Sequence, residues 1–166
     1  MTQTLAQQQL VLNTLCQTLA DPEPQVRAKA AESLGRLELQ AALPNLLAQL
    51  NDPSPLVRLS IIQALGQLRA AAAIPQLIPL LLDEIPEIRA AAADTLGKIG
   101  NEHTIDYLLT TLNDNTPTVR ATAVQALGEI GSEATIPSLL QAFQDASDTV
   151  RIHAIESVSK IYAREA

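Results

Sequence analysis

The sequence predicts an all-α protein made of five helical hairpins, and two observations lead to this prediction. Apolar residues make up 47% of the 166 residues and are mainly Leu, Ala and Ile, whereas only 2% of the residues are aromatic. Such a composition favours helices over strands. The second observation is a strict internal repeat, since the pair Val26-Arg27 recurs as Val57-Arg58, Ile88-Arg89, Val119-Arg120 and Val150-Arg151.

The step between these pairs is 31 residues, with no insertion or deletion. A fixed period of this length is typical of stacked helical repeats, in which each unit buries its apolar face against its neighbours. We therefore expect one domain over residues 1–166. Its predicted repeats are 1–38, 39–69, 70–100, 101–131 and 132–166.

Each repeat begins with a helix whose apolar residues follow helical spacing. In the second repeat they are Leu43, Leu46, Leu47 and Leu50, an i, i+3, i+4, i+7 pattern. The first helices are predicted near 4–19, 43–50, 74–82, 104–112 and 135–143.

The second helix of each repeat follows a short turn that ends in proline in four of the five copies. Proline suits the first turn of a helix, where its missing N–H is not needed. These prolines are Pro24, Pro55, Pro86 and Pro117, and Asp148 takes the position in the fifth repeat. The second helices are predicted near 24–37, 55–68, 86–99, 117–130 and 148–162.

Glycine recurs near the end of four second helices, as Gly35, Gly66, Gly97 and Gly128. Because glycine inside a helix costs about 1 kcal/mol relative to alanine, its recurrence predicts a close contact with a neighbouring helix. None of these glycines belongs to a phosphate-binding GxGxxG motif.

An aspartate stands six residues before an arginine in every repeat, which predicts a structural ladder. The carboxylate falls in the turn before the second helix, where free N–H groups and the helix dipole favour an anion. The arginine can reach the aspartate of its own repeat or that of an adjacent repeat. Recurrence in every repeat favours structure over catalysis. The ladder residues are Asp21, Arg27, Asp52, Arg58, Asp83, Arg89, Asp114, Arg120, Asp145 and Arg151.

A helical wheel of the second helix leaves one strip of four positions per repeat outside the wide apolar arc. We expect this strip to bind a protein or peptide, chiefly in the three middle repeats, because the terminal repeats also serve as caps. The predicted binding residues are Leu56, Ser60, Gln63, Gln67, Glu87, Ala91, Asp94, Lys98, Thr118, Thr122, Gln125 and Glu129.

Several other functions are disfavoured. The formal charge of −7 opposes binding to nucleic acid or to an anionic membrane, and no segment reaches the roughly 20 apolar residues of a membrane span. Cys16 lacks a disulfide partner, and His103 and His153 form no recognisable metal-ligand motif. We therefore predict a cytoplasmic protein that is not an enzyme and has no catalytic residue, metal site or cofactor.

The segments VRATAVQALGEIG (119–131) and IRAAAADTLGKIG (88–100) resemble the HEAT-like repeats named after the phycobilisome lyases. This resemblance implies a right-handed α-solenoid whose second helices line the concave surface. It also implies an alternative function, as a bilin lyase component or phycobilisome-handling factor with a phycobiliprotein as partner. The first two repeats depart from the pattern at the helix end, with Glu38 and Arg69 in place of Gly100 and Gly131.

Overall fold

The computed structural model describes residues 2–164, and every regular element in that range is helical. The chain forms two compact units, Met1–Ala73 and Ile74–Ala166. The predicted all-α fold of successive helical hairpins is therefore confirmed within each unit. A single domain over residues 1–166 stays a prediction.

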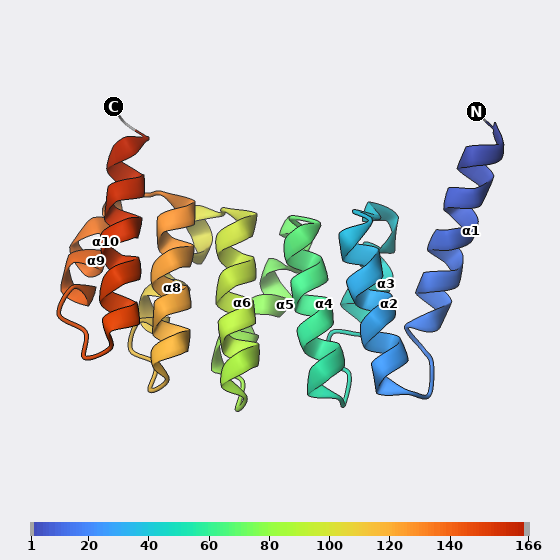
Figure 1. Ribbon diagram of the computed structural model, residues 1–166, viewed down its shortest axis with the longest axis horizontal. Helices are drawn as coiled ribbons and strands as arrows, with labels where there is room; N and C mark the ends of the chain where they lie inside the picture. Colours follow the sequence, from blue (N-terminus) through green and yellow to red (C-terminus); the bar gives the residue numbers. More distant parts are fainter. Residues whose placement is uncertain (1, 165–166) are drawn as a thin grey trace. The chain divides into compact units, whose positions relative to one another are not determined.

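The first unit contains four α-helices and two short 3₁₀ helices. They are α1 (Thr2–Thr18), α2 (Pro24–Arg36), η1 (Gln40–Ala42), α3 (Leu43–Ala48), α4 (Pro55–Gln67) and η2 (Ala71–Ala73). The second helices of the two repeats, α2 and α4, lie side by side (Figure 1). Leu34, Leu46, Ile61 and Leu65 are among the fully buried side chains of this unit.

The second unit continues the same alternation. It contains α5 (Ile74–Leu77), η3 (Ile78–Leu82), α6 (Pro86–Ile99), η4 (Glu102–Thr104), α7 (Ile105–Thr111), α8 (Pro117–Ile130), η5 (Glu133–Thr135), α9 (Ile136–Ala142) and α10 (Asp148–Ala163). Helices α6, α8 and α10 stand in a row in Figure 1, and each packs against the next. Leu77, Leu96, Leu108 and Leu127 are fully buried here.

The observed helices agree with the predicted ranges to within about two residues at each end, except in one place. The first helix of the third repeat was expected to run over 74–82, but it divides into the α-helix α5 and the 3₁₀ helix η3. Pro79 explains the division, because it has no N–H to donate to the carbonyl of Pro75 and its ring crowds that carbonyl. The four predicted prolines all begin second helices, as expected.

Helices α2, α4, α6 and α8 are each followed by a left-handed residue, whether or not that residue is glycine. Gly100 and Gly131 have φ of +70° and +77°, and Glu38 and Arg69 have φ of +52° and +47°. After Glu38 the chain closes a Schellman motif, with the N–H of Leu39 donating to the carbonyl of Leu34 at 3.1 Å. The cap geometry is therefore retained in the first two repeats, although a side chain in this conformation costs about 1–2 kcal/mol.

The predicted close contacts at the recurring glycines are confirmed at three of them. A methyl group built on Gly97 would lie 2.6 Å from the Cα of Ala126 on α8, and one built on Gly128 would lie 2.6 Å from the Cβ of Ser157 on α10. At Gly35 the corresponding distance to the Cα of Ala64 on α4 is 2.7 Å. The backbones of successive second helices therefore approach each other as closely as glycine allows.

Replacing Gly97 by alanine tests this packing. Alanine favours the helix by about 1 kcal/mol, yet its methyl group would push α6 away from α8, and overpacking of this kind typically costs about 1–3 kcal/mol. We expect Gly97→Ala to lower the free energy of unfolding by roughly 1–2 kcal/mol in urea titrations. Lys98→Ala, at the exposed neighbouring position, should change it by only about 0.5 kcal/mol. Equal stability of the two variants would contradict the close contact.

Candidate binding surface

Arg27, Arg89 and Arg120 each bind the aspartate of the following repeat through two parallel hydrogen bonds. Arg27 donates from Nε and Nη2 to the carboxylate of Asp52 at 2.7 and 2.9 Å. Arg89 binds Asp114 at the same two distances, and Arg120 binds Asp145 with both at 2.8 Å. The sequence left open which repeat supplies the carboxylate, and these three pairs answer the question.

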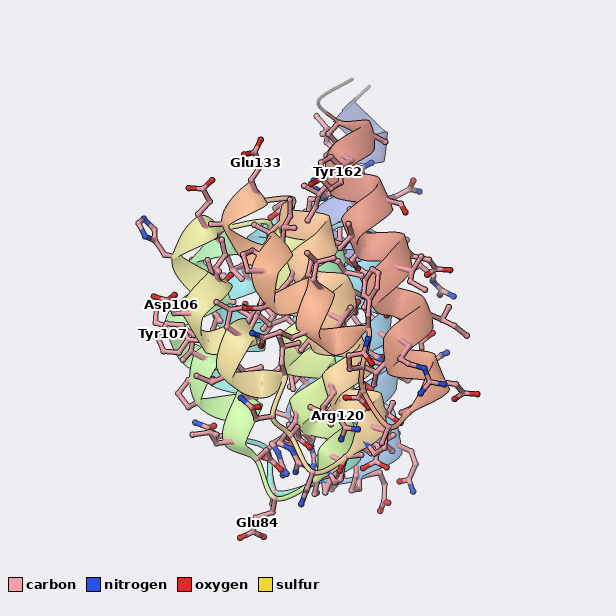
Figure 2. The ribbon with its side chains drawn as sticks, turned by 90° about the vertical axis from the view of Figure 1, so that its left-hand side faces the viewer. Glu84, Asp106, Tyr107, Arg120, Glu133 and Tyr162 are labelled. Atoms are coloured by element: carbon pink, nitrogen blue, oxygen red, sulfur yellow. The ribbon has the colours of Figure 1, made fainter. Side chains whose placement is uncertain are left out.

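Each arginine also holds the turn of its own repeat. Nη1 of Arg89 donates to the main-chain carbonyl of Asp83 at 2.8 Å. The same bond joins Arg27 to Asp21, Arg58 to Asp52, Arg120 to Asp114 and Arg151 to Asp145. Figure 2 shows Arg120 and Glu84 at the same end of the second unit, and Glu84 belongs to the turn that precedes α6. One guanidinium thus ties two neighbouring turns together.

The aspartates are oriented for this bond by their own backbone. Oδ1 of Asp145 accepts the N–H of Ser147, two residues on, at 2.8 Å. The same contact occurs at Asp21, Asp52, Asp83 and Asp114. Each carboxylate is therefore fixed in its turn before the arginine adds its two bonds, which reduces the entropy lost in pairing.

The pairing lowers the pKa of the Asp52, Asp114 and Asp145 carboxyls. The hydrogen bond from Arg120 holds the pKa of Asp145 below its ordinary range, and the bond from Arg27 does the same for Asp52. Burial acts to raise the pKa of Asp114, but the bonds from Arg89 and from the Thr116 N–H outweigh it. These carboxylates stay charged in the folded protein well into acid.

All the predicted binding residues lie at exposed or half-buried positions of the second helices. Four are on α4 in the first unit, and the other eight are on α6 and α8 in the second. In order they are Leu56, Ser60, Gln63, Gln67, Glu87, Ala91, Asp94, Lys98, Thr118, Thr122, Gln125 and Glu129. Their accessibility fits a surface that meets a partner, and the binding role itself stays a prediction.

The second unit has a groove of about 370 Å³ across three consecutive second helices. It brings together four predicted residues, Asp94 and Lys98 of α6 and Gln125 and Glu129 of α8. Glu87, Ala91, Thr118 and Thr122 do not line it. The remaining lining residues are Ala126 of α8 and Glu156, Ser157 and Lys160 of α10.

The predicted set omitted these last four residues, for two different reasons. Glu156 and Lys160 stand one repeat after Gln125 and Glu129, so the register already placed them on the strip, but the last repeat was treated as a cap. Ala126 and Ser157 are buried and form the floor between adjacent helices. No feature of the sequence separates such floor residues from other buried positions.

The groove combines paired and unpaired charges. Lys98 pairs with Asp94 on the same helix at 2.6 Å, and Lys160 of α10 reaches across to Glu129 of α8. Glu156 forms no hydrogen bond or ion pair with any other described residue. The amide of Gln125 lies 3.4 Å from Nε2 of His153. This arrangement offers a partner the free carboxylate of Glu156, the amide of Gln125 and the two paired ammonium groups of Lys98 and Lys160.

The described residues contain no cluster of three His, Cys, Asp or Glu side chains that could hold a metal ion. Cys16 is half-buried on α1, and burial raises the pKa of its thiol, which keeps it protonated at neutral pH. Figure 2 shows Asp106 and Tyr107 close together on α7, a helix that contributes no residue to the groove. Over residues 2–164, no helix combines the length and the apolar character needed to cross a membrane.

Comparisons with known proteins identify the repeats. The HEAT repeat family matches the chain over residues 12–85, 43–123 and 80–159. A search of curated protein sequences gives no match.

Solved structures share the fold. One is from the complex of CpcE and CpcF of phycocyanin lyase from Nostoc sp. PCC7120, with a TM-score of 0.80 and 24% identity over 92% of this chain and 65% of that chain. A computationally designed armadillo repeat protein for modular peptide recognition has a TM-score of 0.67 and 22% sequence identity. That match covers 92% of this chain and 82% of the designed chain. A designed armadillo repeat protein in complex with the peptide (KR)4 has a TM-score of 0.68 and 21% sequence identity. That match covers 90% of this chain and 81% of the designed chain. The chain thus spans less than two thirds of the lyase-complex chain, and identities this low show the fold alone.

Removing one ladder arginine should destabilise the second unit. Arg120→Ala removes the arginine donor from the half-buried carboxylate of Asp145 and from the carbonyl of Asp114, and such a loss typically costs about 1–3 kcal/mol. We expect a decrease of that size in the free energy of unfolding by urea titration. Arg36→Ala, an exposed arginine outside the ladder, is the control and should have almost no effect. Equal unfolding midpoints for wild type and Arg120→Ala would remove the ladder as a source of stability.

The lowered pKa of Asp145 predicts how stability depends on pH. A carboxyl whose folded pKa is depressed stabilises the protein above its unfolded pKa, about 3.9, and loses this contribution as the pH falls through the folded value. The stability difference between wild type and Asp145→Asn should therefore be largest near pH 7 and shrink below about pH 4. Urea titrations at several pH values measure it. A difference that persists unchanged in acid would show that the charge of Asp145 contributes nothing.

Proposed function

This chain belongs to the HEAT repeat family, and we propose that it is a non-catalytic scaffold that binds a protein or peptide partner on the exposed face of its second helices. The groove across α6, α8 and α10 carries the proposal. Its length over three repeats suits an extended segment of a partner better than a compact small molecule, because hydrogen-bonding groups recur along it at the spacing of the helices.

The similarity to designed armadillo repeat proteins supports this proposal. One of them was designed for peptide recognition and another is in complex with a peptide. Both share the arrangement of stacked helices, so the architecture is compatible with the recognition of an extended chain. In the first unit, the strip of Leu56, Ser60, Gln63 and Gln67 on α4 is the corresponding proposed surface.

The similarity to a chain of the phycocyanin lyase complex favours a second candidate function. On this alternative the protein is a bilin lyase component or a phycobilisome-handling factor, and its partner is a phycobiliprotein. Co-expression with a phycobiliprotein and its bilin separates the two candidates. A covalent adduct with zinc-enhanced fluorescence that depends on this chain would establish the alternative, and its absence would leave the scaffold proposal. The cytoplasmic location inferred from the sequence stays a prediction.

Site-specific photo-crosslinking tests where a partner binds. A photoreactive residue at Gln125, in the groove, should give a discrete crosslinked product with one protein in cells that produce this chain natively. The same residue at Gln76 is a matched control, because that exposed glutamine lies on the first helix α5 of the same unit. Crosslinking from Gln76 but not from Gln125 would move the binding surface to the first helices.

The affinity for the crosslinked partner can then be measured with purified proteins. A large charged side chain on the strip should obstruct docking, so Ala91→Arg and Gln125→Arg should each weaken binding by roughly tenfold or more. Thermal unfolding should stay nearly unchanged, since both positions face solvent at least in part. Unchanged affinity in both variants would contradict the proposed surface.

A further inference from the structure

The negative charge of this protein is concentrated in the second unit. Residues 74–166 contain thirteen of the 18 acidic residues and six of the 11 basic ones, whereas the five acidic and five basic residues of the first unit balance. The whole formal charge of −7 therefore belongs to the unit that contains the groove. A protein surface with such a surplus attracts cationic partners and repels anionic ones before contact is made.

Carboxylates also outnumber basic groups on the strip itself. The strip positions of α6, α8 and α10 include the four acidic residues Glu87, Asp94, Glu129 and Glu156. The two basic residues of the strip are both paired, Lys98 with Asp94 and Lys160 with Glu129. Glu87, in the first turn of α6, forms no ion pair with a described residue. The strip therefore offers a partner unneutralised negative charge.

The paired carboxylates of the strip can still accept hydrogen bonds from a partner. Lys98 donates to Oδ2 of Asp94, and no described residue donates to Oδ1. The side chains of Lys98 and Asp94 are 52% and 46% exposed. Ion pairs this exposed are weak, because water competes for both groups. A cationic group of a partner can therefore share Asp94 with Lys98.

Three polar side chains cross the groove in one row. Asp94, Gln125 and Glu156 occupy the same repeat position on α6, α8 and α10, which stand side by side (Figure 1). Packed helices lie about 8–10 Å apart, so the two carboxylates of the row are separated by roughly 16–20 Å. An extended chain advances about 3.3 Å per residue and covers this span with about six residues.

The middle of the row and the floor below it suit a main chain better than a large apolar side chain. The amide of Gln125 can both donate and accept hydrogen bonds, as a peptide backbone requires. Ala126 and Ser157, which form the floor, are small and offer no deep pocket for an aromatic anchor. Charge and hydrogen bonding must therefore supply the selectivity of this surface.

We propose that the groove binds an extended basic segment of the partner, with one lysine or arginine at Asp94, a second at Glu156, and the main chain between them against Gln125. This inference rests on the proposed function and names the chemistry of the segment. Arginine suits Glu156 well, since its guanidinium forms two parallel bonds with one carboxylate. An acidic segment meets the same carboxylates with repulsion.

Fluorescence anisotropy with three labelled peptides tests the proposal. Each peptide has eight residues and alternates serine with arginine, glutamine or glutamate. At about 100 mM salt, where charges beyond about 10 Å are largely screened, the arginine peptide should bind the full chain at least fivefold more tightly than the other two. Raising the salt to about 500 mM should weaken its binding further.

Substitutions that each remove one negative charge locate the binding. Asp94→Asn and Glu156→Gln should each weaken binding of the arginine peptide by roughly two- to fivefold, the value of one exposed charge pair. Asp106→Asn is the matched control, because it removes the same charge from an exposed position of α7 in the same unit. This control should bind the peptide as wild type does. Thermal unfolding checks that all three variants are folded.

Two results overturn the inference. One is equal affinity for the arginine and glutamine peptides, and the other is a loss of affinity in Asp106→Asn as large as in Glu156→Gln, which would indicate attraction to the whole unit rather than to the groove. The scaffold proposal is tested separately by crosslinking from Gln125. A crosslinked partner segment without basic residues would overturn the basic specificity and leave the scaffold intact, whereas no crosslink from Gln125 would count against the scaffold itself.

Discussion

Arg27, Arg89 and Arg120 each bind two turns at once, because Nη1 donates to a carbonyl of its own turn while Nε and Nη2 bind the carboxylate of the next. The spacing between successive second helices therefore depends on the reach of one guanidinium. The glycine contacts set the same spacing at the other end of these helices, where Gly97 lets α6 approach Ala126 of α8. A second helix held at both ends has little freedom to tilt, and this rigidity keeps Asp94, Gln125 and Glu156 in one groove.

The sequence predicted the fold closely because its signals repeat. A helix boundary that is ambiguous in one copy is resolved by the other four, which is why the helix-starting prolines identified the second helices almost to the residue. The prediction was wrong at 74–82, where a single proline, Pro79, interrupts an otherwise apolar helical pattern. The retained caps at Glu38 and Arg69 were not predictable from glycine alone, because the tertiary contacts of each repeat outweigh the local cost of a left-handed side chain.

The candidate site was predictable only as a face of a helix. The register gave Asp94, Lys98, Gln125 and Glu129, but it could not show which exposed positions line a depression. That depends on small buried residues such as Ala126 and Ser157, which lower the floor between two helices, and on ion pairs such as Lys160 with Glu129 that cross from one helix to the next. The partner of each ladder arginine was undecided for a similar reason. The aspartate six residues before an arginine and the aspartate twenty-five residues after it both lie within reach of the guanidinium. The turn that orients each carboxylate selects the later aspartate as the partner.

The proposed binding strip is separate from the contacts between repeats, and this separation follows from how the repeats are built. Within a second helix, one face packs on the preceding second helix, the opposite face packs on the following one, and the strip between them faces solvent. Partner binding uses the strip, where Gln125 and Glu156 lie, whereas the packing faces carry buried side chains such as Val124 and Leu127. A substitution on the strip therefore changes the surface that a partner meets, while the contacts that hold successive helices together stay intact.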